Sequence, residues 1–205
     1  MFSPISELVD DIRQGKMVII VDSEDRENEG DFVMAAEAVT PEAVNFMVTH
    51  GRGLVCILIH PDIAEKVDLK PLPKRGRSRF GTNFSISVEA ACGVGTGISA
   101  VDRAHTIKTI IADDAKPEDL ISPGHMFPII AHVDGVLGRH GHTEAACDLA
   151  KLAGFKPAGV LVEILNEDGT MARRPDLVLV AKRFGLKMGT VEDLVKYREE
   201  MRAES

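Results

Sequence analysis

The sequence predicts a single α/β domain, and three observations lead to that prediction. Short apolar runs rich in β-branched residues alternate along the chain with segments that carry helix-capping residues at their ends. The chain has 205 residues, which is enough to bury a substantial core in one domain. No repeat, low-complexity tract or linker divides the sequence, so we expect one domain over residues 1–205.

The chain is expected to begin with a helix and a hairpin. Ser3 and Pro4 are expected to open the first helix and Gly15 to close it, because these residue types suit the two ends of helices. Two short buried strands follow, over Met17–Val21 and Phe32–Ala36, and an acidic turn joins them.

The remaining predicted elements are bounded by glycine, proline, serine or threonine, which mark helix ends and turns. In order, they are a helix over 40–50 ended by Gly51, a strand over 54–59, a short helix from Pro61, a loop over 70–81, a half-buried strand over 84–88, a glycine turn over 93–97, a helix from Ser99, a loop over 122–125, a strand over 127–131, a helix over 143–152, a strand over 160–165, a turn over 166–169 and a helix from Thr190.

Composition limits the location and the partners of the protein. The net charge of −8 gives no overall attraction for nucleic acid, and no apolar run approaches the ~20 residues of a membrane span. The N-terminus lacks the pattern of a secretory signal. Cys56, Cys92 and Cys147 are odd in number and widely spaced, which favours reduced thiols in the cytoplasm over disulfides or a zinc site.

The turn DSEDRENEGD concentrates negative charge between the first two predicted strands. Its carboxylates are Asp22, Glu24, Asp25, Glu27, Glu29 and Asp31. Each close pair repels by about 1 kcal/mol even in water, and Arg26 offsets only one charge. Two interpretations stay open: the turn is fully solvated, or a hard divalent metal, which prefers oxygen ligands, neutralises it.

Positive charge concentrates in the loop KPLPKRGRSRFG. Its basic residues are Lys70, Lys74, Arg75, Arg77 and Arg79. Long loops of this kind are often either unstructured or functional. The loop is therefore either a solvated excursion or a cationic lid that helps to collect an anion.

Two glycine-containing turns precede predicted helices. The turn over Gly93–Gly97 does not have the spacing of a dinucleotide-binding turn, so we expect tight packing there, with a subsidiary phosphate contact left open. The segment RHGHT is more informative, because Arg139 is a forked cation, Gly141 lets the backbone approach a ligand and Thr143 opens a helix. It predicts a phosphate site, which only one of His140 and His142 is expected to face.

Two further polar residues are candidates for proton transfer. His125 lies in a Pro-Gly loop, where side chains are often held for function. Glu163 interrupts an otherwise apolar strand. It is either a buried proton-transfer group with a raised pKa, if the strand is central, or a solvated residue on an edge strand.

Taken together, these segments resemble the 3,4-dihydroxy-2-butanone-4-phosphate synthase family of riboflavin biosynthesis. The matching segments are residues 25–31, 96–100, 123–125, 139–144 and 157–163. The resemblance runs from about the first helix to the last. The sequence departs from the family pattern at Gly95, where the family usually has threonine, and in the charge of the loop over 74–79.

The resemblance implies a fold, a reaction and a set of residue roles. The fold would be a three-layer α/β/α arrangement with a mixed β-sheet. The reaction would be the Mg²⁺-dependent conversion of ribulose 5-phosphate to 3,4-dihydroxy-2-butanone 4-phosphate and formate, with Mn²⁺ as a substitute metal. The implied roles are metal ligation by Glu27 and His142, substrate binding by Arg26, Glu27, Asp31, Arg139, Gly141, Thr143 and Glu163, and catalysis by His125 and Glu163.

The resemblance also implies a homodimer with active sites at the subunit interface. Members of the family occur fused to a GTP cyclohydrolase II domain, and we expect this chain to stand alone because it lacks the cysteine cluster for that domain's zinc. Two other functions stay open. One is a metal-dependent sugar-phosphate isomerase or aldolase, and the other is a non-catalytic phosphate- or nucleotide-binding module.

Overall fold

The computed structural model describes residues 2–76 and 80–203, and its named strands form one seven-stranded sheet. The strands are β1 (Val18–Val21), β2 (Gly30–Ala35), β3 (Cys56–Ile59), β4 (Val88–Ala90), β5 (Leu120–Ile130), β6 (Ala158–Glu163) and β7 (Met188–Thr190). Their order across the sheet is β4-β5-β3-β6-β2-β1-β7. Two neighbouring pairs, β3–β5 and β1–β7, are parallel and the others are antiparallel, so the predicted mixed sheet is confirmed.

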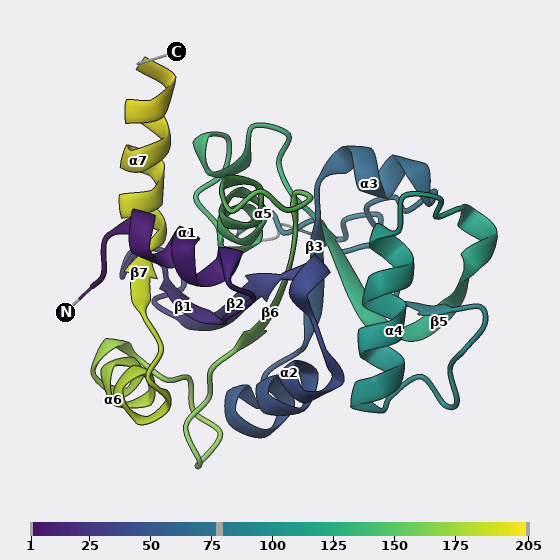
Figure 1. Cartoon of the computed structure of the whole chain (residues 1–205), viewed down its shortest axis with the longest axis horizontal. Coiled ribbons are helices and arrows are strands. Elements are labelled where there is room, and N and C mark those ends of the chain that lie inside the picture. The colour runs from purple at the N-terminus through teal and green to yellow at the C-terminus, as the bar shows by residue number, and fades with distance from the viewer. Residues whose placement is uncertain (1, 77–79, 204–205) are drawn as a thin grey trace.

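Helices cover both faces of this sheet (Figure 1). They are α1 (Ile5–Arg13), α2 (Pro41–Phe46), α3 (Pro61–Lys66), α4 (Ala100–Ile111), α5 (His142–Leu152), α6 (Arg174–Phe184) and α7 (Val191–Ala203). Buried side chains of α1, α5 and α7 form one core with the sheet, and those of α2, α3, α4 and α6 form another on the opposite face. The expected three-layer α/β/α architecture is therefore confirmed.

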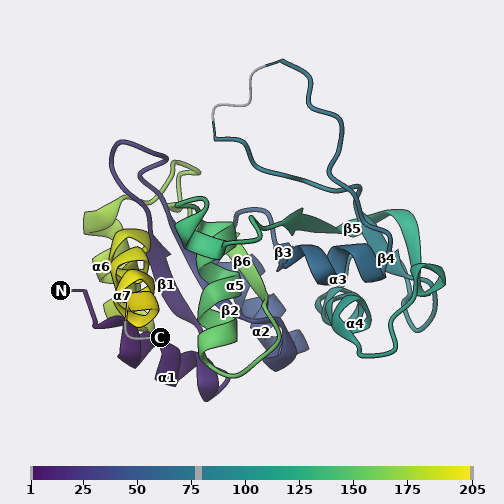
Figure 2. The ribbon, with the colours of Figure 1, turned by 90° about the horizontal axis from the view of Figure 1, so that it is seen from above.

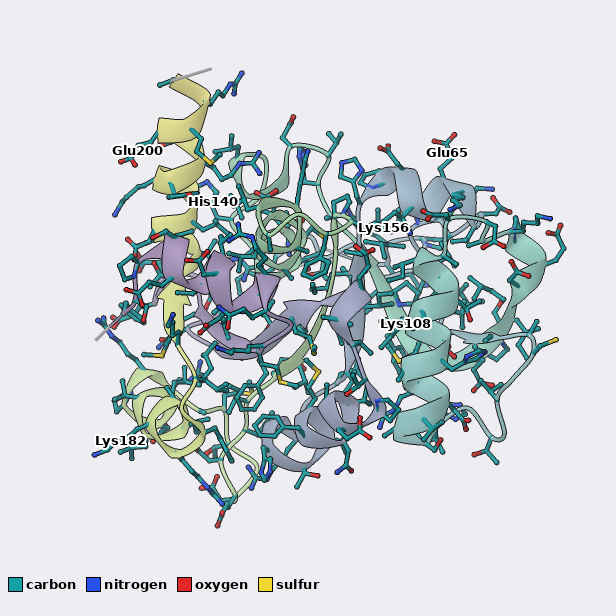
Figure 3. The ribbon with its side chains drawn as sticks, viewed as in Figure 1. Glu65, Lys108, His140, Lys156, Lys182 and Glu200 are labelled. Atoms are coloured by element: carbon teal, nitrogen blue, oxygen red, sulfur yellow. The ribbon has the colours of Figure 1, made fainter. Side chains whose placement is uncertain are left out.

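Alternation along the strands explains why there are two cores. Val18 and Ile20 of β1 point to the α1 side, whereas Ile19 and Val21 point to the α4 side, and all four side chains are buried. This is the period of two residues that a strand imposes on its side chains. Lys108 of α4 is exposed on the outside of its helix (Figure 3). No helix within residues 2–76 and 80–203 is long and apolar enough to cross a membrane.

Local capping signals predict several helix starts correctly. Thr40, Ser99 and Thr190 each accept a hydrogen bond from the backbone N–H three residues further on, at 3.0–3.2 Å. Such a bond satisfies one of the N–H groups that a helix start leaves without an intrahelical partner.

Other helix boundaries differ from the sequence prediction. Pro4, not Ser3, occupies the N-cap position of α1, and no side chain caps this helix. The helix expected over 40–50 is α-helical only as far as Phe46, because its last turn, Met47–Gly51, widens into a π-helix. Thr143 was expected to cap α5, but the N-cap is Gly141, two residues earlier.

The strand prediction is wrong around β4 and β5. Of the strand expected over 84–88, only Val88 belongs to β4, and Phe84 makes only an isolated bridge to β5. The loop expected over 122–125 lies within β5. The pairing passes from Val88–Met126 to Glu89–Ile121, so residues 122–125 bulge out of the ladder.

Two elements near the C-terminus were not predicted. These are α6 and β7, which follow the turn over 166–169. That turn is confirmed by the hydrogen bond from Asn166 N–H to the Thr170 carbonyl, 2.7 Å long. The described parts of the connection between α3 and β4, on either side of residues 77–79, extend away from the body of the protein (Figure 2).

Candidate active site

Asp22 organises the acidic turn between β1 and β2. Its buried carboxylate accepts hydrogen bonds from the backbone N–H groups of Glu27 at 3.0 Å and Glu29 at 2.9 Å. It also pairs with the Arg26 guanidinium at 2.8 Å. One acidic residue therefore folds the turn around itself, which rules out the interpretation of a fully solvated turn.

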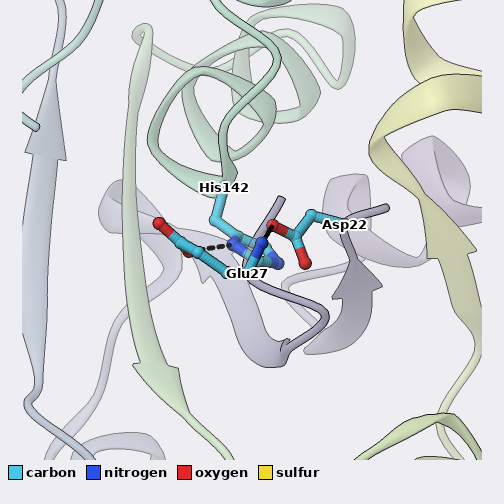
Figure 4. Close-up of side chains that lie close together, drawn as sticks. All are labelled: Asp22, Glu27 and His142. Atoms are coloured by element: carbon cyan, nitrogen blue, oxygen red, sulfur yellow. Dashed lines mark hydrogen bonds and ion pairs between the residues drawn. The ribbon is translucent and has the colours of Figure 1, made fainter. Parts of the chain in front are cut away.

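Three ionisable side chains meet where this turn contacts the start of α5. His142 Nδ1 lies 3.6 Å from Glu27 Oε2 and 3.7 Å from Asp31 Oδ2. Figure 4 shows Glu27 and Asp22 on either side of the His142 ring. One potential ligand atom from each of Asp22, Glu27 and His142 lies within 4.8 Å of the others, which is close enough to share a metal ion.

Within the described residues, two polar atoms at this junction are buried without a hydrogen-bond partner. They are Asp31 Oδ1 and His142 Nε2. Leaving a buried polar atom unpaired costs about 1–3 kcal/mol, so such atoms commonly mark a site that a ligand completes. Carboxylate oxygens and an imidazole nitrogen are suitable donors for a divalent cation. Because the Asp22 oxygens already hold the turn together, Glu27 and His142 fit the role of metal ligands better.

The pKa values in this cluster reflect burial and close charges. Burial raises the pKa of Asp31 to about 7, although His142 opposes the rise. Burial acts to lower the pKa of His142, but the carboxylates of Asp31 and Glu27 raise it to about 9. Burial also acts to raise the pKa of Glu27, but His142 and Arg26 together hold that pKa below its usual value. The junction thus attracts positive charge, whether a proton or a metal ion.

A cleft of about 330 Å³ opens beside this cluster. The predicted site residues that line it are Arg26, Glu27, Asp31, Arg139, His142, Thr143 and Glu163. They come from the acidic turn, β2, the segment just before α5, the start of α5 and the end of β6. The structure therefore brings together seven of the nine predicted site residues, all except Gly141 and His125.

Glu163 ends β6, which lies at the centre of the sheet, so the edge-strand alternative is wrong. It pairs in register with Asp31 of β2, and its carboxylate accepts a hydrogen bond from Leu54 N–H at 2.8 Å. The side chain is only partly buried and lines the cleft. This arrangement holds a carboxylate in place and leaves it accessible from the cleft.

Arg139 and the backbone at Gly141 form the other side of the site. The Arg139 guanidinium pairs with Glu144 at 2.6 Å and donates to the Phe80 carbonyl and to Thr82 Oγ1, each at 3.0 Å. A Cβ at Gly141 would collide with the side-chain ends of Arg139 and Glu144, so a larger residue there would displace their ion pair. Gly141 thus contributes to the site through its close approach to Arg139 and Glu144, although it does not line the cleft.

The end of the basic loop thus reaches the cleft. Phe80 and Thr82 line it, and the Arg26 guanidinium lies 5.3 Å from the centre of the Phe80 ring. Arg77 and Arg79 lie outside the described residues. The role of the basic side chains as a lid therefore stays a prediction.

Only one of the two neighbouring histidines faces the site, as expected. His142 is buried at the start of α5, whereas His140 is exposed to solvent (Figure 3). The helix start has no side-chain cap, which leaves its first N–H groups available to an anion beside Thr143.

His125 does not line this cleft. It lies in the bulge of β5, half exposed, and its Nδ1 contacts the carboxylate of Glu89. In the sheet order, β3 separates its strand from β6, which carries Glu163. Sequence reasoning missed Glu89, because a glutamate in a short strand carries no local signal of its partner.

The glycine turn over Gly93–Gly97 does not act as a phosphate site within this chain. Its N–H groups at Gly95 and Gly97 donate to the carboxylate of Asp102, at 3.1 and 3.0 Å. Asp102 therefore occupies the position that an anion would take.

The fold and the cleft define a class of site in which carboxylates and a histidine that could hold a metal ion lie beside two arginines and an open helix start. The family model for 3,4-dihydroxy-2-butanone 4-phosphate synthase matches residues 6–197. A Photobacterium phosphoreum protein named 3,4-dihydroxy-2-butanone 4-phosphate synthase is 55% identical over 196 residues, covering 96% of this chain and 54% of the relative. The Aquifex aeolicus riboflavin biosynthesis protein RibBA is 56% identical over 199 residues, covering 96% and 49%. The chain belongs to the 3,4-dihydroxy-2-butanone 4-phosphate synthase family.

Solved structures agree with this assignment. A 3,4-dihydroxy-2-butanone 4-phosphate synthase in complex with two magnesium ions matches with a TM-score of 0.93 and 37% identity, over 98% of this chain and 99% of that one. The two-domain synthase RibBX from A. baumannii matches with a TM-score of 0.92 and 52% identity, over 96% and 58%. The chain spans about half the length of the curated relatives it matches.

Proposed function

We propose that this protein is a lyase that converts D-ribulose 5-phosphate to L-3,4-dihydroxy-2-butanone 4-phosphate and formate in riboflavin biosynthesis. One observation carries the proposal. The acidic turn, the start of α5 and Glu163 all meet in the same cleft. Family membership makes this reaction the first to test.

We propose Mg²⁺ as the cofactor, with Glu27 and His142 as its ligands and Mn²⁺ as a substitute. The buried, unpartnered His142 Nε2 supports a cation here, and a structural relative is described in complex with two magnesium ions. The bound ion would supply positive charge that stabilises adjacent oxyanions formed during the reaction. A histidine ligand is less typical of Mg²⁺ than a carboxylate, which is why Mn²⁺ is included.

The substrate phosphate would lie at the start of α5, beside Arg139, Gly141 and Thr143. The uncapped N–H groups and the positive end of the helix dipole favour an anion there. Arg26 and Asp31 would bind the substrate hydroxyls, together with Glu27. The phosphate itself does not react, so its binding energy serves to orient the reacting carbons.

Glu163 and His125 would carry the protons. Enolisation at C3 needs a base and loss of the C1 hydroxyl needs a proton donor. Glu163 lines the cleft at the end of a rigid strand, which suits one of these tasks. His125 suits the other only if it reaches the same substrate.

We propose that His125 reaches it across a homodimer interface. Exposed apolar side chains also occur in β5, which carries His125, and in segments before and after β4, at Ile86, Ile98, Val101 and Ile121. Exposed apolar groups of this kind are typical of surfaces that a second subunit covers. Each site would then combine Glu163 of one subunit with the partner subunit's His125.

Subunit mixing tests this arrangement. His125→Ala and Glu163→Gln homodimers are each expected to lose at least about 100-fold in activity and to keep a measurable residual rate. Random reassociation of equal amounts would give heterodimers with one intact site, and about a quarter of wild-type activity would return. Sites built within one chain would give no recovery.

The reaction itself is tested with ribulose 5-phosphate and Mg²⁺, with and without a chelator, by carbon NMR. Metal-dependent formate, equal in amount to the four-carbon phosphate, would support the synthase. Substrate consumption without formate would indicate an isomerase or aldolase. No consumption by folded protein with either metal, together with metal-independent binding of sugar phosphates, would indicate a binding module.

We also propose that residues 1–205 form one domain and that the protein acts in the cytoplasm, where its three free cysteines would stay reduced. Cell fractionation with an antibody against the protein tests the location.

A further inference from the structure

The side chains of His125 and Glu89 are in hydrogen-bonding contact outside the cleft. His125 Nδ1 contacts Glu89 Oε1, and the Glu89 side chain is 12% exposed whereas that of His125 is 48% exposed. The other ring nitrogen, Nε2, has no partner in the described part of the chain. The partly buried carboxylate thus holds one side of the imidazole ring and leaves the other side accessible.

The backbone is shaped to accommodate the Glu89 carboxylate. Gly97 adopts a positive φ of 83°, and a Cβ there would collide with the Glu89 carboxylate. A Cβ at Gly124 would collide with the backbone of Val88 and with Glu89 Cγ. The space that these two glycines leave is therefore filled by Glu89.

The β-bulge then turns His125 toward this carboxylate. In a regular antiparallel ladder that continued from Val88–Met126, Glu89 would lie directly opposite His125 on the neighbouring strand. Instead Glu89 pairs with Ile121, and the segment 122–125 bulges out and is tied back by Gly124 N–H, which donates to the Ser87 carbonyl at 3.1 Å. Bulges commonly redirect a side chain in this way.

We propose that Glu89 is a positioning residue for His125 in the proposed synthase reaction. The ionised Glu89 carboxylate accepts the Nδ1–H of His125, which fixes the neutral ring in the tautomer whose Nε2 carries a lone pair. That nitrogen is the one available to take a proton from the substrate. A carboxylate that orients a histidine in this way stabilises the imidazolium that forms when the proton is taken.

The inference rests on the proposed function for its catalytic part, and its first test does not need activity. In ¹⁵N-histidine-labelled full-length protein at alkaline pH, His125 is assigned by comparison with His125→Gln. We expect the Nε2 signal of wild type to have the shift of an unprotonated ring nitrogen. In Glu89→Ala we expect it to move toward the shift of a protonated one, because the partner of Nδ1–H is gone.

Kinetics form the second test. We expect Glu89→Ala to lower kcat about 10- to 100-fold, with KM within about twofold, as is typical when a group that orients a functional histidine is lost. Glu89→Gln, which keeps the shape and removes the charge, guards against misfolding of the alanine variant and should show a smaller loss. Glu118→Gln removes an exposed carboxylate shortly before β5 and should leave both readouts unchanged.

A double variant separates positioning from a merely structural role. If Glu89 acts through His125, Glu89→Ala should cost nothing further in a His125→Ala background. Additive losses, or wild-type ¹⁵N shifts in Glu89→Ala, would overturn the proposal. If wild type makes no formate, the proposed function fails separately, and the ¹⁵N shifts still decide whether Glu89 fixes the tautomer.

Discussion

Two helices of this protein begin after glycine turns, and they use their N-termini in opposite ways. At α4, Ser99 caps the helix, and Asp102 folds back to accept the N–H groups of Gly95 and Gly97. At α5, Gly141 is the N-cap and no side chain caps the helix. The first helix start is therefore satisfied internally, and the second is open toward the cleft.

The difference depends on one acidic residue at the same position of each helix. Asp102 and Glu144 are both the third residue of their helix. Asp102 turns back to the glycine turn, whereas Glu144 turns to Arg139 and to the His132 N–H, at 2.6 and 2.9 Å. A glycine turn before a helix thus indicates an anion site only when no side chain of the protein already occupies it.

Among the variants that test this difference between the two helix starts, the largest loss of activity is expected at Glu163, beside the open start of α5. Glu163→Gln removes proton transfer and keeps the shape and the hydrogen bond from Leu54 N–H. We expect kcat to fall at least about 100-fold, the range seen for loss of a general acid or base. Formate release at saturating substrate measures it.

The control for this variant is a measurement that its fold is intact. Circular dichroism and thermal unfolding should match wild type, because the glutamine fits the same space at the end of β6. A Glu163→Gln enzyme with a near wild-type rate would show that the catalytic assignment is wrong.

The next effect concerns the metal. Glu27→Gln removes one charged ligand, so the Mg²⁺ concentration for half-maximal activity should rise at least about tenfold. Its melting temperature in chelator should change little, since Asp22 holds the turn through the backbone N–H of residue 27. An unchanged metal titration would exclude Glu27 as a ligand.

A smaller effect is expected at the phosphate end of the cleft. Arg139→Lys keeps the charge and loses the forked contacts to Glu144, Phe80 and Thr82. We expect KM for ribulose 5-phosphate to rise about tenfold, with a smaller change in kcat. Arg183→Lys, on the exposed side of α6, is the matched control. A fall in kcat with KM unchanged would contradict a binding role for Arg139.

The sequence predicts those parts of the fold and site that local patterns determine. Apolar strands and capping residues such as Ser99 and Thr190 act within a few residues, and they were read correctly. The segments RHGHT and DRENEGD, read with the family resemblance, also identified residues that do meet in the cleft.

The features that the sequence did not predict depend on contacts with residues distant in the chain. The residues over 84–87 alternate like a strand, but the chain leaves the ladder there and only isolated bridges form. Likewise, no local pattern indicates that Glu89 meets His125, because their contact requires the pairing of β4 with β5.

The smallest effect is expected on protein stability, at the start of α4, where Asp102 accepts the N–H groups of the glycine turn. This effect depends on pH. Hydrogen bonds with Gly95 N–H, with Ser99 and with Gly97 N–H hold the pKa of Asp102 below its ordinary value of 3.8. Because the pKa of Asp102 is lower in the folded protein than in the unfolded chain, the ionised carboxylate stabilises the fold at pH values above the ordinary pKa. The stabilisation is lost as pH falls through the lowered pKa.

Asp102→Asn should therefore be less stable than wild type at about pH 7, and the gap should narrow below about pH 4. Urea unfolding at fixed protein concentration measures the gap, with Asp114→Asn as the exposed control that should show none. A gap that stays constant with pH would mean that the shape of residue 102, not its charge, holds the turn. The two helix starts would then differ in packing rather than in which anion occupies them.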